Sequence, residues 1–374
     1  MKVIRNALII GGGIAGMSTA IELRKRGVGV DLVEQDEGWR VYGAGITING
    51  AALRAFKTLG VVRQIVDQGW CSDGCDICTP SGDLLGNLPT PRIAGADIPG
   101  SGGILRPVLA RILSQATLAS GTAVKLGVTF TRLELEDDAV DVSFTDGSRT
   151  RYDLVVGADG LFSRVRAAVF PQLPPPKYTG QGCWRVVVPR APEITAASMF
   201  MGRLTKAGVN PVSKDEMYLF CLDHRETHER VPEVQWTGIL KGLLTEFGGA
   251  VGRIREALDA QSRILYRPLE SILAPAPWHR GRVVLAGDSA HATTPHLASG
   301  AAISVEDALV LVDELDRAAS VEAALTAYAA RRFERCRMVV ENSLRLGEIE
   351  ITGGSKEEHA QVMRESMIAL LTPI

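Results

Sequence analysis

The chain has 374 residues, of which 46% are hydrophobic and 22% are charged, a composition typical of folded proteins and unlike that of disordered segments. This length predicts a sizeable core and two structural units. Lys and Arg total 41 against 43 Asp and Glu, so the net charge of −2 offers no overall positive field to nucleic acid or anionic lipid. The uncharged stretch Ser289–Val305 is shorter than the roughly 20 apolar residues that cross a bilayer. We therefore expect no membrane span and no nucleic-acid partner.

The six cysteines form neither a dense disulfide framework nor the paired spacing of a zinc site. Cys71, Cys75 and Cys78 lie close together in sequence, but no fourth ligand stands at a suitable spacing, so we expect free thiols and no metal site. The N-terminal apolar stretch is interrupted by Gly11 and Gly13, which is unlike a secretory signal. These features favour a cytoplasmic location.

The first 34 residues predict a strand, a helix and a second strand. Val3–Ile10 is a nearly continuous apolar run, which is typical of a strand covered on both faces in a parallel sheet. Ala15–Arg26 carries apolar residues on one side and charged residues on another, and it stops at Gly27, so it is expected to be a helix. Val28–Glu34 returns as a strand and completes a βαβ unit.

Further strands are predicted later in the chain. Val140–Phe144 alternates between apolar and polar residues and is followed by Asp146-Gly147, a hairpin-type turn. Leu154–Val156 and Val283–Ala286 are apolar strands that run into Gly157 and into Gly287-Asp288. Doubly wound folds bind their ligands beyond such strand ends.

A separate sheet is predicted over residues 181–267, where short β-rich runs such as Trp184–Val188 and Met217–Leu222 occur and few helical patterns precede Trp236. The proline-rich segment Pro171–Pro176 is expected to cross between two structural units. Residues from Val321 to about Leu371 follow a mostly helical pattern.

The segment from Gly11 to Gly16 reads GGGIAG and satisfies the dinucleotide-binding pattern GxGxxG between a predicted strand and a predicted helix. Gly11 permits the tight turn, Gly13 lets the backbone approach a pyrophosphate at the helix N-terminus, and Gly16 permits close packing of helix on strand. Glu34, at the end of the second strand, can accept the ribose hydroxyls and disfavours a 2′-phosphate. The dinucleotide is therefore expected to be FAD or NAD.

Four segments, in order from residue 7 to about 310, resemble the flavin-dependent aromatic hydroxylases, the single-component family typified by p-hydroxybenzoate hydroxylase. They are the glycine fingerprint, RVYGAGI from Arg40, GADGLFSRVR from Gly157, and GDSAH from Gly287 with Thr294-Pro295. The resemblance implies an α/β fold with a FAD-binding Rossmann-like domain, an inserted β-sheet substrate domain and a C-terminal helical segment. The expected boundaries are 1–75, 100–175 and 270–320 for the FAD domain, 76–99 and 176–269 for the substrate domain, and 321–374 for the helical segment.

The same resemblance implies where FAD would bind. Asp288 would accept hydrogen bonds from the ribitol, the helix that begins near Gly300 would present N–H groups to the flavin, and Pro295 would lie beside its reactive edge. Arg106 would reach the phosphates and Arg40 would be a second cofactor-side cation, although either could be a solvated surface charge. The expected cofactor-binding residues are Gly11, Gly13, Ile14, Ala15, Gly16, Glu34, Gln35, Arg40, Arg106, Val128, Asp159, Asp288, Gly300, Ala301 and Ala302.

Two local features near Pro295 bear on the resemblance to the flavin-dependent aromatic hydroxylases. The family commonly shows Gly-Gln-Gly followed by Asn, whereas ASGAA stands at Ala298–Ala302 here, so backbone donors are kept and side-chain contacts are lost. His291 and His296 are separated by a proline and do not share a helical face, so paired metal ligation is not expected. His291 is interpreted as a packing residue with a satisfied hydrogen bond.

In the family, the substrate lies between the flavin and the sheet of the middle domain. Tyr218 is the preferred polar contact because its phenol could orient a ring hydroxyl or N–H, and Tyr218 and Pro295 are the expected catalytic residues. Core packing alone could explain the apolar candidates. The expected substrate-binding residues are Thr47, Arg185, Met201, Tyr218 and Phe220.

The substrate class is indicated by weaker features. The segment from Gly182 to Pro189 together with Glu216-Met217-Tyr218 resembles monooxygenases that act on alkylquinolones and other fused heteroaromatics. A flat apolar ring would suit a wall built from Met199, Met201, Val209, Met217 and Phe220, if that wall faces the pocket. An inward-pointing Arg185 would instead favour a phenolate or a carboxylate.

The expected function is an NAD(P)H-dependent flavin monooxygenase that hydroxylates an aromatic or heteroaromatic small molecule through a C4a-hydroperoxide of noncovalent FAD, with O₂ as co-substrate. Only one dinucleotide fingerprint is present, so NAD(P)H is expected to bind transiently. The alternatives are a flavin oxidoreductase or halogenase that inserts no oxygen, and a non-enzymatic flavin sensor. A monomer and a homodimer both stay open, as does the choice between NADH and NADPH.

Overall fold

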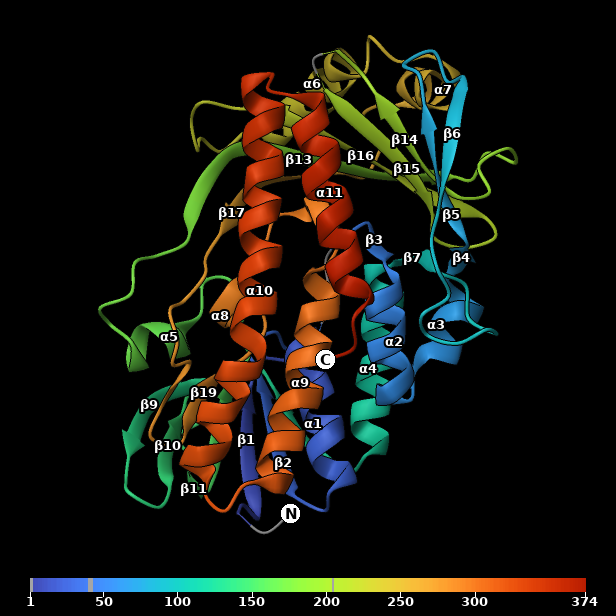
Figure 1. Cartoon of the computed structure of the whole chain (residues 1–374). Coiled ribbons are helices and arrows are strands. Elements are labelled where there is room, and N and C mark those ends of the chain that lie inside the picture. The colour runs from blue at the N-terminus through green and yellow to red at the C-terminus, as the bar shows by residue number, and fades with distance from the viewer. Residues whose placement is uncertain (1–2, 40–42, 204) are drawn as a thin grey trace.

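A mostly parallel sheet of six strands forms the lower half of the computed structural model, which describes residues 3–39, 43–203 and 205–374 (Figure 1). Its central strands are short apolar runs that are buried on both faces, as the sequence predicts for a covered parallel sheet. Their spatial order is β18 (His279–Arg280), β19 (Val283–Leu285), β12 (Leu154–Gly157), β1 (Asn6–Ile10), β2 (Gly29–Glu34) and β8 (Ala123–Leu126).

The predicted βαβ unit is confirmed. Strands β1 and β2 pair directly in parallel, and α1 (Ile14–Lys25) connects them. Helix α1 contacts α4 (Arg106–Ala119) and α9 (Gly300–Arg317), and these helices lie beside the sheet (Figure 1). The predicted hairpin is confirmed within a three-stranded antiparallel sheet of β9 (Phe130–Leu135), β10 (Val140–Phe144) and β11 (Arg149–Tyr152).

A seven-stranded sheet lies above the first one in Figure 1 and contains the β-rich stretch that the sequence predicts. Helices α6 (Trp236–Leu243) and α7 (Gly249–Ala257) cover one of its faces. The strand order is β17 (Ile264–Ser271), β13 (Lys177–Pro189), β16 (Glu216–His224), β15 (Lys206–Pro211), β14 (Ala197–Met201), β5 (Gly74–Cys78) and β6 (Leu84–Pro89). The division of the chain into a FAD domain and a substrate domain stays a prediction.

Smaller elements join the two large sheets. Helix α5 (Arg164–Val169) precedes the proline-rich segment that leads into β13, and the short helices α8 (Asp288–His291) and η2 (Pro295–Leu297) precede α9. A second three-stranded sheet is formed by β3 (Gly45–Ile48), β7 (Ser101–Leu105) and β4 (Trp70–Ser72), and next to it lie α2 (Gly50–Leu59) and α3 (Val62–Gln68).

The C-terminal residues form the helical segment that the sequence predicts, as α10 (Val321–Thr352) and α11 (Lys356–Leu371). Helix α10 runs past both large sheets, and it contacts α9, η2 and β13 (Figure 1). The structure shows no helix, within the ranges it describes, that is long and apolar enough to cross a bilayer.

Candidate functional site

The glycine loop between β1 and α1 has the shape that a dinucleotide requires. Gly11 has φ +109°, and a Cβ there would lie 2.3 Å from the carbonyl oxygen of Ala158. A Cβ on Gly16 would lie 2.0 Å from the carbonyl oxygen of Gly11, so the helix packs against its own turn. By contrast, a Cβ on Gly13 would meet nothing within 4 Å, and no side chain caps α1 at this residue. An open surface with unsatisfied N–H groups therefore lies where a pyrophosphate would bind.

Glu34 lies against this loop from the end of β2. One of its carboxylate oxygens accepts the N–H of Gly12 at 2.7 Å, and the other accepts the N–H of Asp36 at 2.9 Å. Trp39, which the sequence analysis did not single out, donates its indole N–H to the carbonyl oxygen of Gly12 at 2.9 Å. No motif marks this tryptophan, because its contact depends on the path of the chain after β2.

Three other predicted cofactor-binding residues are Gln35, Val128 and Arg40. Gln35 is the residue after Glu34, and the N–H of Val128 donates to the carbonyl oxygen of Glu34 at 3.1 Å. Arg40 lies outside the described residues. The structure thus brings Glu34, Gln35 and Val128 together at one strand end, and their contacts with a cofactor stay a prediction.

Asp288 of α8 and Arg106 at the start of α4 lie close enough for their charges to interact. The Asp288 side chain is exposed to solvent, yet the surrounding protein removes enough hydration to raise the pKa of its carboxyl. Burial, followed by the nearby charge of Arg185, lowers the pKa of Arg106. A carboxyl that is both accessible and surrounded by protein is expected in an internal cleft that holds a ligand.

The first turn of α9 closes one side of the site. Ser299 occupies the N-cap position, but no side chain caps the helix, so N–H groups of the first turn, which includes Gly300, Ala301 and Ala302, stay available. The Ser299 hydroxyl instead donates to the carbonyl oxygen of Leu297 at 2.7 Å and accepts from the amide of Asn49 at 2.9 Å. The Ser299 side chain therefore ties the loop before α9 to Asn49.

Asp159 has a defined role within its own loop. Its carboxylate accepts hydrogen bonds from the hydroxyl of Ser163 and from the N–H of Val165, and it thereby shapes the start of α5. Burial raises the pKa of this carboxyl. Arg166 donates to the carbonyl oxygens of Leu161 and Ser289, both at 2.7 Å, which ties this loop to α8. Contact between Asp159 and a cofactor stays a prediction.

The face of the seven-stranded sheet that is not covered by α6 and α7 carries Tyr218. The Tyr218 hydroxyl lies 2.9 Å from the hydroxyl of Thr47, which also accepts a hydrogen bond from the amide of Asn210 at 3.0 Å. The Tyr218 ring is 5% exposed, and a Cβ on Gly45 would lie 2.0 Å from it. The structure thus brings two predicted residues together and adds Asn210, for which the sequence holds no local signal.

Arg185 and Phe220 are paired across β13 and β16, so they share this face with Tyr218. The Arg185 guanidinium has no hydrogen-bond or ion-pair partner within the described part of the chain. Met201 is on the same face at the far end of β14 and is 44% exposed, which places it at the rim.

Two of the five residues of the methionine-rich wall face the other side of the sheet. Val209 and Met217 belong to the core between the sheet and helices α6 and α7, so the condition that the whole wall faces the pocket is not met. Strand alternation explains the difference, because Met199 and Phe220 stand one residue out of phase with Val209 and Met217 in the pairing register.

Glu350 of α10 closes the opposite end of this face. It forms an ion pair with Lys206 of β15, and Nε2 of His359 of α11 lies 3.0 Å from one of its carboxylate oxygens. The Nε2 atom of His296 lies 3.3 Å from Glu350, and the Nδ1 atom lies 2.8 Å from the hydroxyl of Thr294. Lys206 and Glu350 are 144 positions apart, so no sequence pattern could indicate the pair.

Two clefts open next to this face. One of about 860 Å³ is lined by Ala44, Leu105, Val187 and Leu265 among others. A second of about 760 Å³ is lined by Gln181, Thr294, His296 and Gly347 among others. The first cleft thus includes Val187 and Leu265, which lie on the same side of the sheet as Tyr218.

These features fit FAD, because an open glycine turn, an accessible carboxylate at Asp288 and the uncapped first turn of α9 match a pyrophosphate, a ribitol chain and a flavin ring. The sequence matches the family described as FAD binding domain over residues 5–343. The chain belongs to this FAD-binding family. Like the family members it resembles, the protein is a FAD-dependent monooxygenase of the aromatic hydroxylase type.

Individual members of the FAD-binding family are similar over most of the chain. The aurachin C monooxygenase/isomerase of Stigmatella aurantiaca is 31% identical over 383 residues, covering 100% of this chain and 96% of that protein. The 2-heptyl-3-hydroxy-4(1H)-quinolone synthase of Pseudomonas aeruginosa is 33% identical over 310 residues, covering 81% and 79%. The crystal structure of Klebsiella pneumoniae HpxO complexed with FAD and uric acid superposes with a TM-score of 0.83 at 25% identity, covering 98% and 92%.

Proposed function

We propose that this monooxygenase uses NAD(P)H and O₂ to hydroxylate a flat aromatic or heteroaromatic small molecule in the recess between the FAD loops and the seven-stranded sheet. The observation that carries the proposal is the convergence of two sets of polar groups. Asp288 and Arg106 approach from the FAD side, and Tyr218 and Arg185 approach from the sheet.

FAD held by the glycine loop, by Asp288 and by the first turn of α9 would supply electron transfer from NAD(P)H and the activation of O₂. The protein's own residues then have to bind the ring, orient it and exclude water. Val187, Phe220 and Leu265 form a small apolar cluster with Tyr218, which suits the exclusion of water from an aromatic ring.

Tyr218 is the proposed orienting residue. Because Thr47 accepts a hydrogen bond from Asn210, it can donate its own hydrogen to Tyr218. The Tyr218 hydrogen is then free for an oxygen of the substrate. Burial raises the pKa of Tyr218, so the phenol stays protonated and acts as a donor at neutral pH.

Arg185 narrows the substrate class. An unpartnered guanidinium beside an apolar cluster suits a flat ring that carries one anionic or strongly polarised oxygen, such as a phenolate, an enolate or a carboxylate. The names of two relatives refer to aurachin C and to a hydroxyquinolone, which supports a fused heteroaromatic ring that carries an oxygen substituent.

A direct experiment is a screen of aromatic and heteroaromatic compounds for accelerated NAD(P)H oxidation by the FAD-loaded protein, followed by mass spectrometry of the product formed under isotopically labelled O₂. A labelled hydroxyl group on the product supports the proposal. Stoichiometric peroxide with no labelled product across the screen would favour an oxidoreductase that inserts no oxygen. A flavin that NAD(P)H does not reduce with any ligand would favour a sensor.

The chain has one dinucleotide fingerprint, so we propose that NAD(P)H binds transiently at the surface. A cytoplasmic location and a monomeric or homodimeric state stay predictions. Light scattering of the purified protein measures the second directly.

A further inference from the structure

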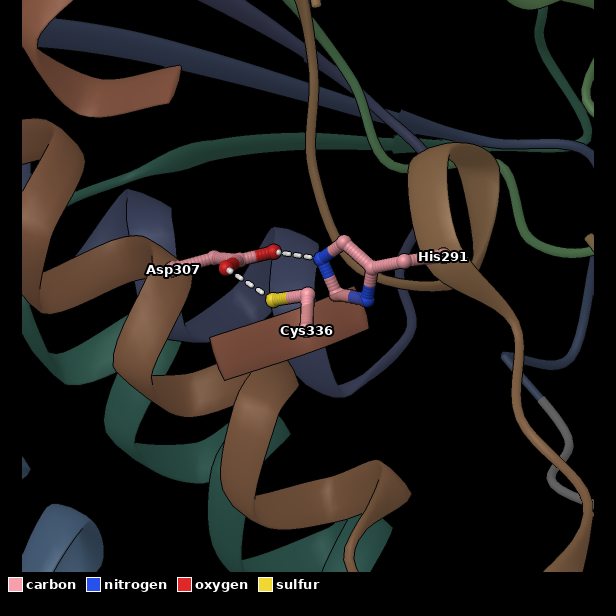
Figure 2. Close-up of side chains that lie close together, drawn as sticks. All are labelled: His291, Asp307 and Cys336. Atoms are coloured by element: carbon pink, nitrogen blue, oxygen red, sulfur yellow. Dashed lines mark hydrogen bonds and ion pairs between the residues drawn. The ribbon is translucent and has the colours of Figure 1, made fainter. Parts of the chain in front are cut away.

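A buried carboxylate holds both ends of the short helix α8, which carries Asp288. Figure 2 shows Asp307 of α9 between His291 and Cys336. One carboxylate oxygen of Asp307 accepts the N–H of Gly287, the residue before α8, at 2.7 Å. The same oxygen lies 2.6 Å from Nε2 of His291, the last residue of α8. Asp307 and His291 are both fully buried, so water cannot replace these bonds.

The backbone conformation of Gly287 explains why its hydrogen bond to Asp307 matters for the orientation of α8. Its φ is +63°, a conformation that favours glycine, and a Cβ there would lie 2.7 Å from the Cβ of Ala15 in α1. The chain must therefore enter α8 in one orientation, close to the glycine loop. The bond from Gly287 to Asp307 fixes that orientation, and with it the direction in which Asp288 enters the recess.

Asp307 also begins a chain of buried ion pairs. Its second oxygen accepts from Nε of Arg332 at 2.8 Å, and another nitrogen of Arg332 lies 3.0 Å from Glu306. Glu306 accepts two hydrogen bonds from Arg335, at 2.8 and 2.7 Å. The carboxylates of two adjacent α9 residues are thus linked through arginines of α10.

This path of ion pairs ends at the C-terminus of α11. Arg335 donates to the carbonyl oxygens of Ala369 and Thr372, both at 3.2 Å. Arg54 of α2 donates to those of Leu371 and Thr372, at 2.7 and 2.8 Å. Cations at a helix C-terminus stabilise its unpaired carbonyl groups. A continuous path of polar contacts therefore joins the end of α11 to the loop that carries Asp288.

The charges in this path support one another. Burial alone would lower the pKa of His291, but the carboxylate of Asp307 outweighs it and holds that pKa well above the usual value. Burial would raise the pKa of Asp307, but His291 and Arg332 lower it to about 2. Removal of one partner would leave an uncompensated buried charge, so the network strongly favours one arrangement.

A metal site is the alternative use of these side chains, since ligand atoms of His291, Asp307 and Cys336 lie within 4.8 Å of one another. The Asp307 oxygens, however, already accept from Gly287 and Arg332, and Arg332 also lies 3.5 Å from the Cys336 sulfur. A cation is already present in the cluster in the form of this guanidinium.

We propose that Asp307 is a positioning residue for FAD, and that the chain of ion pairs through Glu306 couples FAD binding to docking of the C-terminal end of α11. Coupling between two sites is reciprocal. Loss of the α11 contacts should weaken FAD binding, and FAD should protect the C-terminal residues from proteases by the same factor.

Arg335→Met provides the test, because Arg335 contacts neither the glycine loop nor α8. In a flavin fluorescence titration, we expect the Kd of this variant for FAD to be about five- to tenfold higher than that of the wild-type protein, in line with typical coupling energies. In the wild-type protein, FAD should slow release of the C-terminal residues by carboxypeptidase by a similar factor, and this protection should be lost in the variant. Arg337→Met is the matched control, because Arg337 lies on the same helix and, among the described residues, pairs with exposed Glu334 and Glu341 alone.

An Arg335→Met protein with a looser C-terminus and unchanged FAD affinity would overturn the coupling. Asp307→Asn tests the positioning role, with weaker FAD binding expected in the folded fraction measured by circular dichroism. If this variant does not fold, His291→Gln, which removes the imidazolium but keeps a hydrogen-bond donor, replaces it. Unchanged FAD affinity in the folded variant would contradict the role of Asp307. Both readouts concern FAD binding and are independent of hydroxylation.

Discussion

At the scale of single residues, Tyr218 is the clearest test of the substrate face. Tyr218→Phe removes the hydroxyl that contacts Thr47 and keeps the ring against Gly45. We expect coupling of NAD(P)H oxidation to hydroxylation to fall about two- to tenfold, the effect of one lost hydrogen bond, while FAD content stays unchanged. The ratio of product to oxidised NAD(P)H measures this. Unchanged coupling and substrate affinity would remove Tyr218 from the site.

Asp288 belongs to the FAD side of the recess. Its substitution should therefore lower the FAD content, which Tyr218→Phe leaves unchanged. Asp288→Ala is expected to weaken FAD binding by about tenfold or more, because it removes a charged acceptor of hydrogen bonds. The flavin absorbance of the purified protein reports the FAD content. Asp138→Ala, which changes an exposed carboxylate on the surface, should leave it unaltered. Full FAD content in the Asp288 variant would refute the ribitol contact.

Arg185 decides between an uncharged and an anionic substrate oxygen. For a substrate with an anionic oxygen, Arg185→Met should raise KM roughly 10- to 100-fold through loss of a charge-assisted hydrogen bond, with FAD content unchanged. Arg185→Lys should recover only part of this, because lysine cannot bind in the bidentate manner. Equal KM values in all three proteins would show that the guanidinium does not contact the substrate.

At the scale of elements, Glu350 determines how α10 meets the upper sheet. Glu350→Gln leaves Lys206, which is 11% exposed, without its anionic partner, and we expect a loss of about 3 kcal/mol in the free energy of unfolding. The double variant Lys206→Met with Glu350→Gln should lose less than Glu350→Gln alone, because no unpaired cation is left. Urea denaturation of the FAD-loaded proteins measures both. A double variant less stable than the single one would contradict the ion-pair explanation.

The ion pair between Glu350 and Lys206 predicts how the free energy of unfolding depends on pH. Burial alone would raise the pKa of Glu350, but Lys206 and His296 hold it well below the usual value of about 4.3. A carboxyl whose pKa is depressed by folding stabilises the native state above its unfolded pKa and loses that effect as the pH falls. The stability advantage of wild type over Glu350→Gln should therefore be constant above about pH 5 and shrink below pH 4. An advantage that persists at lower pH would mean that the ionised carboxylate is not its source.

At the scale of the whole molecule, the site is assembled by topology. Asp288 follows β19, Glu34 ends β2, and the glycine loop follows β1, and these strands are parallel neighbours or near neighbours in one sheet. Their carboxyl ends therefore meet at one edge. Tyr218 and Arg185 come from a different sheet, and α10 spans both sheets and contributes Glu350 (Figure 1). No single segment of the chain contains both halves of the recess.

The sequence by itself determined the features that depend on local conformation. The glycine pattern predicted the turn before α1, because only glycine fits at Gly11 and Gly16, and apolar runs predicted β1, β2, β12 and β19. The family and the FAD cofactor followed from motifs that keep a fixed spacing. The contacts of Asp159 and Arg106 with FAD, and those of Thr47 and Tyr218 with a substrate, stay predictions.

Only the tertiary structure decided features that depend on register and on distant pairing. The sequence could not show which face of β15 and β16 is turned toward the recess, because a shift of one residue exchanges the two faces. Only the structure shows that Val209 and Met217 face α6 and α7. The Lys206–Glu350 pair and the path from Asp307 to the end of α11 join residues from separate elements. Such contacts leave no periodic trace in the chain, because their geometry exists only once the sheets and helices have packed.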